Sequence, residues 1–203
     1  MRLLTMKKTS IEAEVKIEVD NLEAVERQLV SIGAELKNSE KQVDLYYNHP
    51  CRDYSVTDEA LRLRRRILAK TGHENTDLED FPIIEITYKG PKLDKTTKTR
   101  VESSVGVDSL ENAKSILSSL GFIEVASIEK QRIFYRYGDL TIGLDNVLDV
   151  GCFVEIERMV TEADLVEAAR KELLDLVERI GYNSKDSIRE SYLELYLAKK
   201  SLS

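Results

Sequence analysis

Residues 10–21 read SIEAEVKIEVDN, and their side chains alternate between apolar and charged. Every second residue from Ile11 to Val19 is apolar, and the residues between them are Glu12, Glu14, Lys16 and Glu18. An alternation with a period of two predicts a β-strand that has one apolar and one charged face. Because like charges on one face repel each other, the charged face must either be solvated or lie against something cationic.

The composition of the chain limits its class. With 203 residues it can form one large domain or two small ones. It carries 30 Lys and Arg against 37 Asp and Glu, a net charge of −7, which argues against a general nucleic-acid binder. No run of 18 apolar residues occurs, so no membrane span is predicted. We therefore expect neither nucleic acid nor a membrane as a partner.

The cysteines and histidines do not suggest a zinc site. The only ones are Cys51, Cys152, His49 and His73, and their spacing fits no zinc motif. The first residues, MRLLTMKKTS, are too polar for a signal peptide, so we expect reduced thiols in a cytoplasmic protein. A metal ion would have to be held by carboxylates, which favours hard ions such as Mg²⁺ or Mn²⁺.

An internal repeat is visible in the sequence. Residues 19–33, VDNLEAVERQLVSIG, align without gaps with residues 107–121, VDSLENAKSILSSLG. In the first copy we expect Asp20 to cap a helix and Gly33 to end it. Any two amphipathic helices with acidic caps look alike, but here the matches continue into the flanking segments. The pattern predicts two copies of a strand–helix–strand unit.

The remaining segments are mostly strands. They are predicted at 35–47, 60–66, 82–89, 98–106, 122–137, 139–147 and 150–158. Helices are predicted at 162–180 and 189–199, and a polar loop at 68–80. Because strands mostly follow strands, we expect an antiparallel sheet with the helices segregated from it, which is an α+β fold.

Seven of the predicted strands carry charge on one face, and the charged residues are mainly arginine and glutamate. A solvent-exposed face of the sheet would account for the charges on any single strand, but such a face usually mixes neutral polar residues with lysine. Arginine matches phosphate oxygens in a bidentate fork, and paired carboxylates suit Mg²⁺ or Mn²⁺. Together they indicate a site for a metal-bound polyphosphate. Such a sheet could curl into a charged tunnel, although closure does not follow from the pattern.

Six short motifs resemble those of one family. EAEVK at 12–16 resembles the ExExK signature of the CYTH proteins, or triphosphate tunnel metalloenzymes. This superfamily includes class IV adenylate cyclases, thiamine triphosphatases and inorganic triphosphatases. The other motifs follow in order: LRLRR (61–65), ITYKGP (86–91), TRVE (99–102), KQR (130–132) and LDNVLDVGCFVEIE (144–157). The resemblance implies a single CYTH domain over residues 1–203, with a core at about 11–195.

Two further segments resemble one branch of the family. NHPCRDYSVTDEALRLR (48–64) and SYLEL (191–195) are similar to the CyaB-like class IV adenylate cyclases. The branch implies an eight-stranded antiparallel β-barrel, the triphosphate tunnel, with helices packed outside. The segment at 68–80 is poor in motif residues, so no substrate contact can be carried over to it.

The resemblance also implies roles for individual residues. The triphosphate would be bound by Lys16, Arg62, Arg64, Lys89, Arg100, Lys130 and Arg132. The ligands of Mg²⁺ or Mn²⁺ would be Glu12, Glu14, Glu102, Asp145, Glu155 and Glu157. Lys16, Glu12 and Glu14 are the catalytic candidates. The carboxylates beside Lys16 favour its charged form, so we interpret it as a phosphate ligand in preference to a general base.

The resemblance implies a metal-dependent adenylate cyclase that converts ATP to cyclic AMP and pyrophosphate. The alternatives are a triphosphatase, acting on inorganic triphosphate, thiamine triphosphate or a nucleoside triphosphate, and a non-catalytic polyphosphate-binding module. The sequence does not separate the first two. Tyr192 could donate its hydroxyl into the tunnel mouth, or only pack its helix. Tyr46 and Tyr47 could contact a base or pack with other aromatic residues. The resemblance is also compatible with a homodimer.

Overall fold

A computed structural model describes residues 11–69, 82–92, 100–160 and 165–201, except for the side chains of Ile11, Glu12 and Lys92. The strands are β1 (Ile11–Glu18), β2 (Glu35–Asn48), β3 (Ala60–Leu68), β4 (Ile83–Lys92), β5 (Arg100–Val107), β6 (Ile123–Tyr137), β7 (Leu140–Val147) and β8 (Gly151–Val160). The helices are α1 (Leu22–Ser31), α2 (Tyr54–Thr57), α3 (Leu110–Ser119), α4 (Val166–Arg179) and α5 (Tyr192–Ser201), with a 3₁₀ turn η2 (Ser184–Asp186).

Every strand predicted from the sequence is present, and all neighbouring strands pair antiparallel. The predicted α+β fold is confirmed. The short helix α2 was not predicted, because a single turn is too short to produce a helical pattern. Most of the predicted polar loop at 68–80 lies outside the described residues.

The strand order reflects the internal repeat. The eight strands form one sheet in the order β1-β8-β7-β6-β2-β3-β4-β5. The units β1-α1-β2 and β5-α3-β6 occupy equivalent places at opposite ends of this order, and β2 pairs with β6 at its centre. Exchanging the two copies reverses the order and leaves it otherwise unchanged. The topology therefore has the two-fold symmetry that two copies of one unit would produce.

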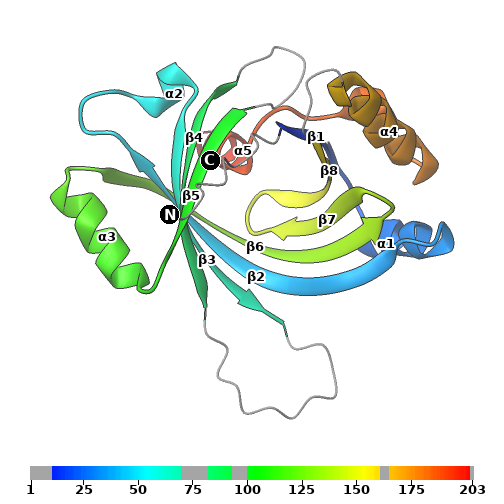
Figure 1. Cartoon of the computed structure of the whole chain (residues 1–203), viewed down its shortest axis with the longest axis horizontal. Coiled ribbons are helices and arrows are strands. Elements are labelled where there is room, and N and C mark those ends of the chain that lie inside the picture. Colours follow the sequence, from blue (N-terminus) through cyan, green and yellow to red (C-terminus); the bar gives the residue numbers. More distant parts are fainter. Residues whose placement is uncertain (1–10, 70–81, 93–99, 161–164, 202–203) are drawn as a thin grey trace, which may run out of the picture.

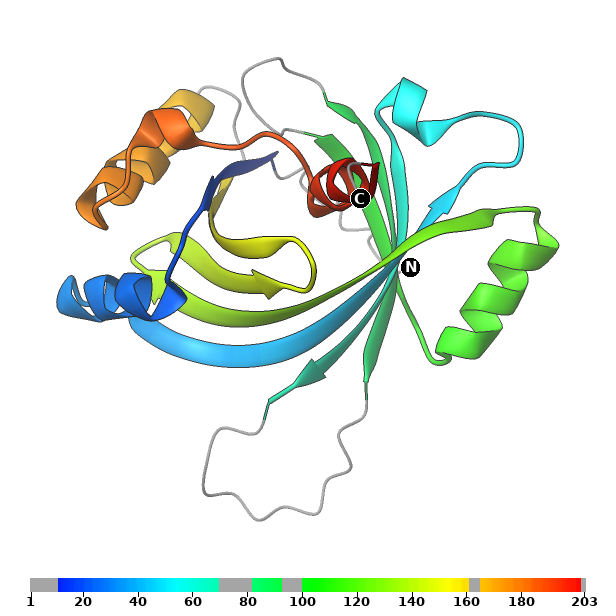
Figure 2. The same ribbon diagram turned by 180° about the vertical axis from the view of Figure 1, so that it is seen from behind.

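The sheet curls into a half-barrel (Figure 1). Among the described residues no ladder joins β1 to β5, so the two ends of the sheet stay apart. Helices α1 and α4 cover the outer face at one end, and α3 covers it at the other (Figure 1). Helix α5 instead lies on the concave side, between the two ends (Figure 2). The concave surface is therefore partly filled by a helix.

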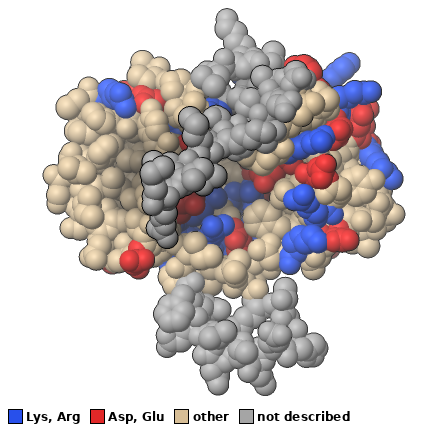
Figure 3. Space-filling model, viewed as in Figure 1, with Lys and Arg blue, Asp and Glu red and all other residues tan. Residues whose placement is uncertain are grey.

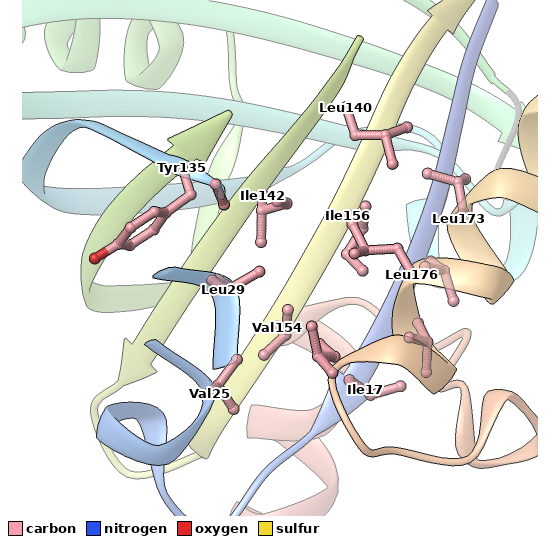
Figure 4. Close-up of a cluster of buried hydrophobic side chains, with 14 of the residues drawn as sticks. Ile17, Val25, Leu29, Tyr135, Leu140, Ile142, Val154, Ile156, Leu173 and Leu176 are labelled. Carbon is pink, nitrogen blue, oxygen red and sulfur yellow. The ribbon is translucent and has the colours of Figure 1, made fainter. Parts of the chain in front are cut away.

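The largest apolar cluster lies between the outer face of β1, β7 and β8 and the helices α1 and α4 (Figure 4). Ile17 contributes from β1, Ile156 from β8 and Leu173 from α4, and each is at most 2% exposed. Burial of one such side chain stabilises the fold by roughly 1.5–3 kcal/mol. Because side chains alternate along a strand, burial of the apolar face turns the charged face toward the concavity.

Two smaller clusters complete the core. One lies under α3 and includes Leu45, Leu63 and Leu117. The other lies on the concave side and joins Phe153 and Tyr192 to α5. This third cluster anchors α5 on the concave side, because the buried ring of Tyr192 packs there against Phe153.

The start of α1 corrects one expectation. Asn21, and not Asp20, is the N-cap, because its Oδ1 accepts a hydrogen bond from the backbone N–H of Ala24 at 3.0 Å. The copy in α3 uses Ser109 in the same way. The predicted stop at Gly33 is confirmed: its φ of +87° is in the left-handed region that favours glycine.

Candidate active site

The concave face and α5 enclose a cavity of about 530 Å³. Most of the residues that the sequence singled out line it: Glu14, Lys16, Arg62, Arg64, Lys89, Arg100, Glu102, Lys130, Arg132, Glu155 and Glu157. Acidic and basic side chains lie next to each other in the hollow at the centre of the face in Figure 3. Strands from both ends of the sheet thus bring predicted phosphate and metal ligands to one cavity.

Among the predicted site residues whose side chains are described, Asp145 is the one that does not line the cavity. Asp145 is fully buried, with an exposed fraction of 0%, and lies behind the lining side chains that it contacts. The side chain of Glu12 lies outside the described part of the chain. The role predicted for Glu12 therefore stays a prediction.

Lys16 is held on three sides and is only 2% exposed. Its Nζ donates to the backbone carbonyl of Glu190 at 2.9 Å and lies 3.2 Å from Oε1 of Glu155. The same atom lies 3.9 Å from the centre of the Tyr192 ring. With these partners the ammonium group of Lys16 points in a fixed direction, as a phosphate ligand should.

Asp145 is the centre of a buried charge cluster. Arg132 donates to it through Nε at 2.6 Å and through Nη2, and Nη2 also contacts Glu155. Lys130 Nζ lies 3.3 Å away, and the hydroxyl of Tyr192 donates to Oδ2 at 2.6 Å. Because Asp145 is surrounded by donors, it fixes the directions of these side chains toward the cavity.

Burial and the neighbouring charges shift the pKa values in this cluster. Burial would raise the pKa of Asp145, but Lys130 and Arg132 outweigh it and lower that pKa. Burial and the adjacent Arg132 together lower the pKa of Lys130 to about 8. The pKa of the Tyr192 hydroxyl is raised by burial and by the carboxylates beside it, so it remains a hydrogen-bond donor.

Asp44 lines the cavity and was not among the site residues predicted from the sequence. Its carboxylate accepts two hydrogen bonds from Arg64, at 2.6 Å each, in a bidentate pair. Burial opposes its ionisation, but the attraction of Arg64 is stronger and holds the pKa of Asp44 well below its usual range. The residue lies opposite Arg64 in the β2–β3 ladder. Its position opposite Arg64 is what marks Asp44 as a partner of a site residue, and the pairing register of two strands cannot be predicted from the sequence of one strand.

The other predicted cations are held less tightly. Arg100 donates to the backbone carbonyl and carboxylate of Asp58 at 3.3 and 3.1 Å. Lys89 pairs with Glu102 at 2.6 Å, where both side chains are partly exposed. The buried Nε of Arg62 has no hydrogen-bond partner among the described residues. A buried donor without a partner is costly, and a ligand that accepts a hydrogen bond there would relieve it.

Tyr46 and Tyr47 differ in what they contact. Tyr47 packs in the cluster under α3, and its hydroxyl donates to Glu124 at 3.3 Å. Tyr46 packs in the cluster with Tyr192 and Phe153. Burial raises the pKa of Tyr46 to about 12. Both rings are buried in apolar clusters, as the packing interpretation predicts, although both also border the cavity.

The carboxylates suit a hard metal ion. Glu14 and Glu157 stand directly opposite each other in the β1–β8 ladder, and both line the cavity. Like charges in this position are unfavourable unless a cation lies nearby. In the described part of the chain no three carboxylate, His or Cys side chains form a ready metal-binding group. The oxygen donors fit Mg²⁺ or Mn²⁺, and Glu155 would have to turn from its basic partners to join them.

The charge of the lining is nearly balanced. Of the residues that the structure describes, eight lysine and arginine side chains and nine aspartate and glutamate side chains border the cavity. A polyanion therefore meets no excess of positive charge unless a divalent cation enters with it. The charge balance and the opposed carboxylates both favour a metal-bound anion over a free one.

Comparisons with known proteins agree with this geometry. The chain is 34% identical over 185 residues to "Putative adenylate cyclase MJ0240" of Methanocaldococcus jannaschii, covering 91% of this chain and 98% of the relative. It is 26% identical over 187 residues to "Adenylate cyclase CyaB" of Aeromonas hydrophila, covering 91% and 87%. No helix in the described residues is long and apolar enough to cross a membrane.

The fold has counterparts among solved structures. The PH1819 protein of Pyrococcus horikoshii OT3 superimposes with a TM-score of 0.80 at 36% identity, covering 93% of this chain and 99% of that one. The CYTH domain matches residues 10–192, which is most of the chain. With the motifs in order along one concave face, these matches show that the chain belongs to the CYTH domain family.

Proposed function

We propose that this protein is a metal-dependent adenylate cyclase of the class IV type, which converts ATP to cyclic AMP and pyrophosphate. The observation that carries the proposal is the single cavity that gathers the predicted phosphate-binding cations beside the opposed carboxylates Glu14 and Glu157. The names of two relatives, at 34% and 26% identity, support the cyclase over other reactions of the family. Such an enzyme would work in the cytoplasm, where ATP is available.

The reaction needs charge neutralisation on the phosphates and a nucleophile held in line. In a cyclase the ribose 3′-hydroxyl attacks the α-phosphate, the bond to the β-phosphate oxygen breaks, and pyrophosphate leaves. Arg64 and Arg132, each fixed by a buried aspartate, would bind phosphate oxygens through the N–H groups that their partners leave free. Preorganised donors of this kind stabilise the developing charge without rearrangement.

The metal would be held by the carboxylates Glu14, Glu155 and Glu157, with Glu12, Glu102 and Asp145 as further proposed ligands. When bound, a divalent ion would supply charge neutralisation and orient the phosphates. Lys16 would act as a phosphate ligand, because Glu155 and the carbonyl of Glu190 already hold its ammonium group. Its role as a general base is the less favoured alternative.

A triphosphatase is the second candidate function, and one observation favours it. The amide of Asn48 borders the cavity and would be a natural reader of a nucleobase. Its Oδ1 accepts from the backbone N–H groups of His49 and Tyr54, and its Nδ2 donates to Asp53. These local bonds use Oδ1 and one N–H of Nδ2 and hold the amide against its own loop, so at most one N–H is left to contact a base. A triphosphatase, with water attacking the terminal phosphate, does not need a base reader.

The test is one set of incubations. Purified protein would receive ATP or inorganic triphosphate with Mg²⁺, Mn²⁺ or EDTA, and the products would be separated by anion-exchange chromatography. Cyclic AMP and pyrophosphate in equal amounts, both abolished by EDTA, are expected. Orthophosphate without cyclic AMP would replace the cyclase with the triphosphatase. Tight binding of either compound without turnover would mean that the protein is a non-catalytic polyphosphate-binding module.

A further inference from the structure

Helix α5, whose first residue is Tyr192, lies on the concave side of the half-barrel, whereas α1, α3 and α4 pack on the outer face (Figure 2). The side chain of Tyr192 is 7% exposed, and its ring packs 5.1 Å from the ring of Phe153. The hydroxyl donates to Asp145, at the centre of the buried charge cluster. Tyr192 is therefore joined both to the apolar end of the cavity and to its charged wall.

The ring of Tyr192 faces two lysines that come from different strands. Nζ of Lys16, on β1, lies 3.9 Å from the ring centre, and Nζ of Lys130, on β6, lies 4.8 Å from it. An aromatic face attracts an ammonium group, and more strongly where water is excluded. Both lysines are at most 4% exposed and both line the cavity. One aromatic side chain thus holds two cations that would otherwise repel each other.

The lysine side chain has a flexible stem with several rotatable bonds, and fixing it in one orientation costs conformational entropy. Where the folded protein already fixes the ammonium group, a ligand does not have to meet that cost when it binds. Each of these lysines also has a carboxylate partner, Glu155 for Lys16 and Asp145 for Lys130. The ring adds a contact that a polyphosphate cannot displace by competing for a hydrogen bond.

We propose that Tyr192 is a positioning residue for triphosphate binding, which holds Lys16 and Lys130 against one aromatic face so that both ammonium groups are oriented before the anion arrives. This inference rests on the proposed function, since it names a residue that prepares the same cavity. The aromatic ring of Tyr192 is the part of the side chain that orients the two ammonium groups. The hydroxyl is secondary, because Asp145 keeps Arg132 and Lys130 as partners without it.

A purely structural role would predict something different. If Tyr192 only fixes α5, any large apolar side chain should replace it, and its neighbours on the helix should matter equally. Tyr196 lies one turn further along α5, in the same apolar cluster, and does not line the cavity. Its ring faces the ammonium group of Lys200, at 5.5 Å from the ring centre, and Lys200 is not a lining residue of the cavity. Tyr196 is therefore the matched control.

The test is calorimetric titration of the full chain with inorganic triphosphate, in EDTA and again with Mg²⁺. Tyr192→Leu should raise the Kd by about tenfold or more, which corresponds to about 1.4 kcal/mol. Tyr192→Phe, which keeps the ring, should stay within about threefold of wild type. Tyr196→Leu should bind as wild type does. Thermal unfolding of each variant reports the folded fraction, and Tyr192→Met replaces the leucine variant if that one does not fold.

The outcomes separate the two proposals. Rescue of affinity by phenylalanine but not by leucine or methionine, at similar melting temperatures, supports the positioning role. Wild-type affinity in a folded Tyr192→Leu or Tyr192→Met protein, or an equal loss in Tyr192→Phe and Tyr196→Leu, would overturn it while the proposed function stands. If the wild-type protein binds no triphosphate with or without Mg²⁺, the proposed function fails, and this inference fails with it.

Discussion

Single residues in the cavity are arranged as charge pairs whose members are buried together. Asp44 and Arg64 show this most clearly. The two nitrogen–oxygen distances of their bidentate contact are both 2.6 Å, and Asp44 is 3% exposed. Buried ion pairs of this kind add little stability compared with apolar side chains of similar size. Breaking one by removing a single partner is costly, however, because the other charge stays buried. The pairs are therefore better explained by the orientation that they impose on the arginines.

We expect Asp44→Asn to destabilise the protein by about 3–5 kcal/mol at pH 7, because Arg64 loses its counter-charge. The folded-state pKa of Asp44 lies below its ordinary value of 3.8. The stability from the ionised carboxylate is thus fully present above pH 3.8 and is lost as the pH falls further. Urea unfolding at pH 7 and near pH 3 should show the difference shrinking in acid. Asp139→Asn, at an exposed carboxylate, is the control, and a difference that does not depend on pH would contradict the prediction.

Gly143 shows how closely the arginine cluster is packed. A Cβ atom added at this position would lie 3.0 Å from Nε and 3.1 Å from Cζ of Arg132. Arg132 cannot easily move away, because Asp145 and Glu155 hold its guanidinium group. The glycine is therefore needed to make room for an arginine that faces the cavity.

Gly143→Ala should accordingly weaken triphosphate binding and destabilise the fold by about 1–3 kcal/mol, the usual cost of overpacking. Calorimetric titration with inorganic triphosphate and urea unfolding measure the two effects. Gly106→Ala is the matched control, since a Cβ atom there would meet only the carbonyl oxygen of Ile84, at 3.9 Å. Unchanged affinity in Gly143→Ala would mean that Arg132 does not contact the ligand.

The elements show which parts of the structure the sequence can predict. Strands such as β1 and β8 alternate regularly, and their faces follow from the period of two alone. The path of α5 could not be predicted, because its apolar side chains fit an outer face and the concave side equally well. The ring of Tyr192 packs on Phe153, as the packing interpretation predicts, whereas its hydroxyl donates to the buried Asp145 and not into the mouth of the cavity.

The site was predictable only in part, for a related reason. Motif residues such as Lys16 and Arg64 could be identified from their own strands, and they do line one cavity. Asp44 could not, because its importance depends on a partner on another strand. The buried position of Asp145 also depends on the packing of α5 above it. Pairing across strands is a property of register, which one strand does not encode.

The caps of the two repeated helices offer a test at the scale of the element. Asn21→Ala should destabilise the protein by about 1 kcal/mol, since the backbone N–H of Ala24 loses its acceptor. Asp20→Ala, one residue earlier, should cost less than half as much. Urea unfolding of the two variants under the same conditions makes the comparison. A larger loss of stability in Asp20→Ala than in Asn21→Ala would mean that Asp20 is the N-cap, as the sequence alone predicted.

On the scale of the whole molecule, the fold brings two copies of one unit together so that their charged faces meet. The first copy contributes Glu14 and Lys16 from β1, and the second contributes Arg100 and Glu102 from the equivalent strand β5. Because both faces mix acids and bases, the described residues that line the shared cavity include one more carboxylate than cations. Duplication of a mixed face therefore explains why the cavity is highly charged and almost neutral.

This balance predicts that divalent metal and triphosphate bind cooperatively. A free triphosphate, with about four negative charges, would face the cavity's own carboxylates, whereas Mg²⁺ would neutralise both and bridge them. We expect the Kd of inorganic triphosphate to fall at least about tenfold when Mg²⁺ replaces EDTA in a calorimetric titration. Glu157→Gln should remove most of this gain and the metal-dependent turnover, while leaving the melting temperature unchanged.

Glu23→Gln, on the exposed start of α1, should leave the metal effect intact and serves as the control for loss of one negative charge. Equal affinity in EDTA and in Mg²⁺ would mean that the cations alone bind the anion, and that the opposed pair of Glu14 and Glu157 does not act as a metal site. If Mg²⁺ still lowers the Kd of triphosphate in Glu157→Gln, the ion would instead be bound by Glu155 and Asp145. In that case the ion would have to displace Arg132 from its carboxylates, and the stability of the protein would depend on Mg²⁺ even without triphosphate.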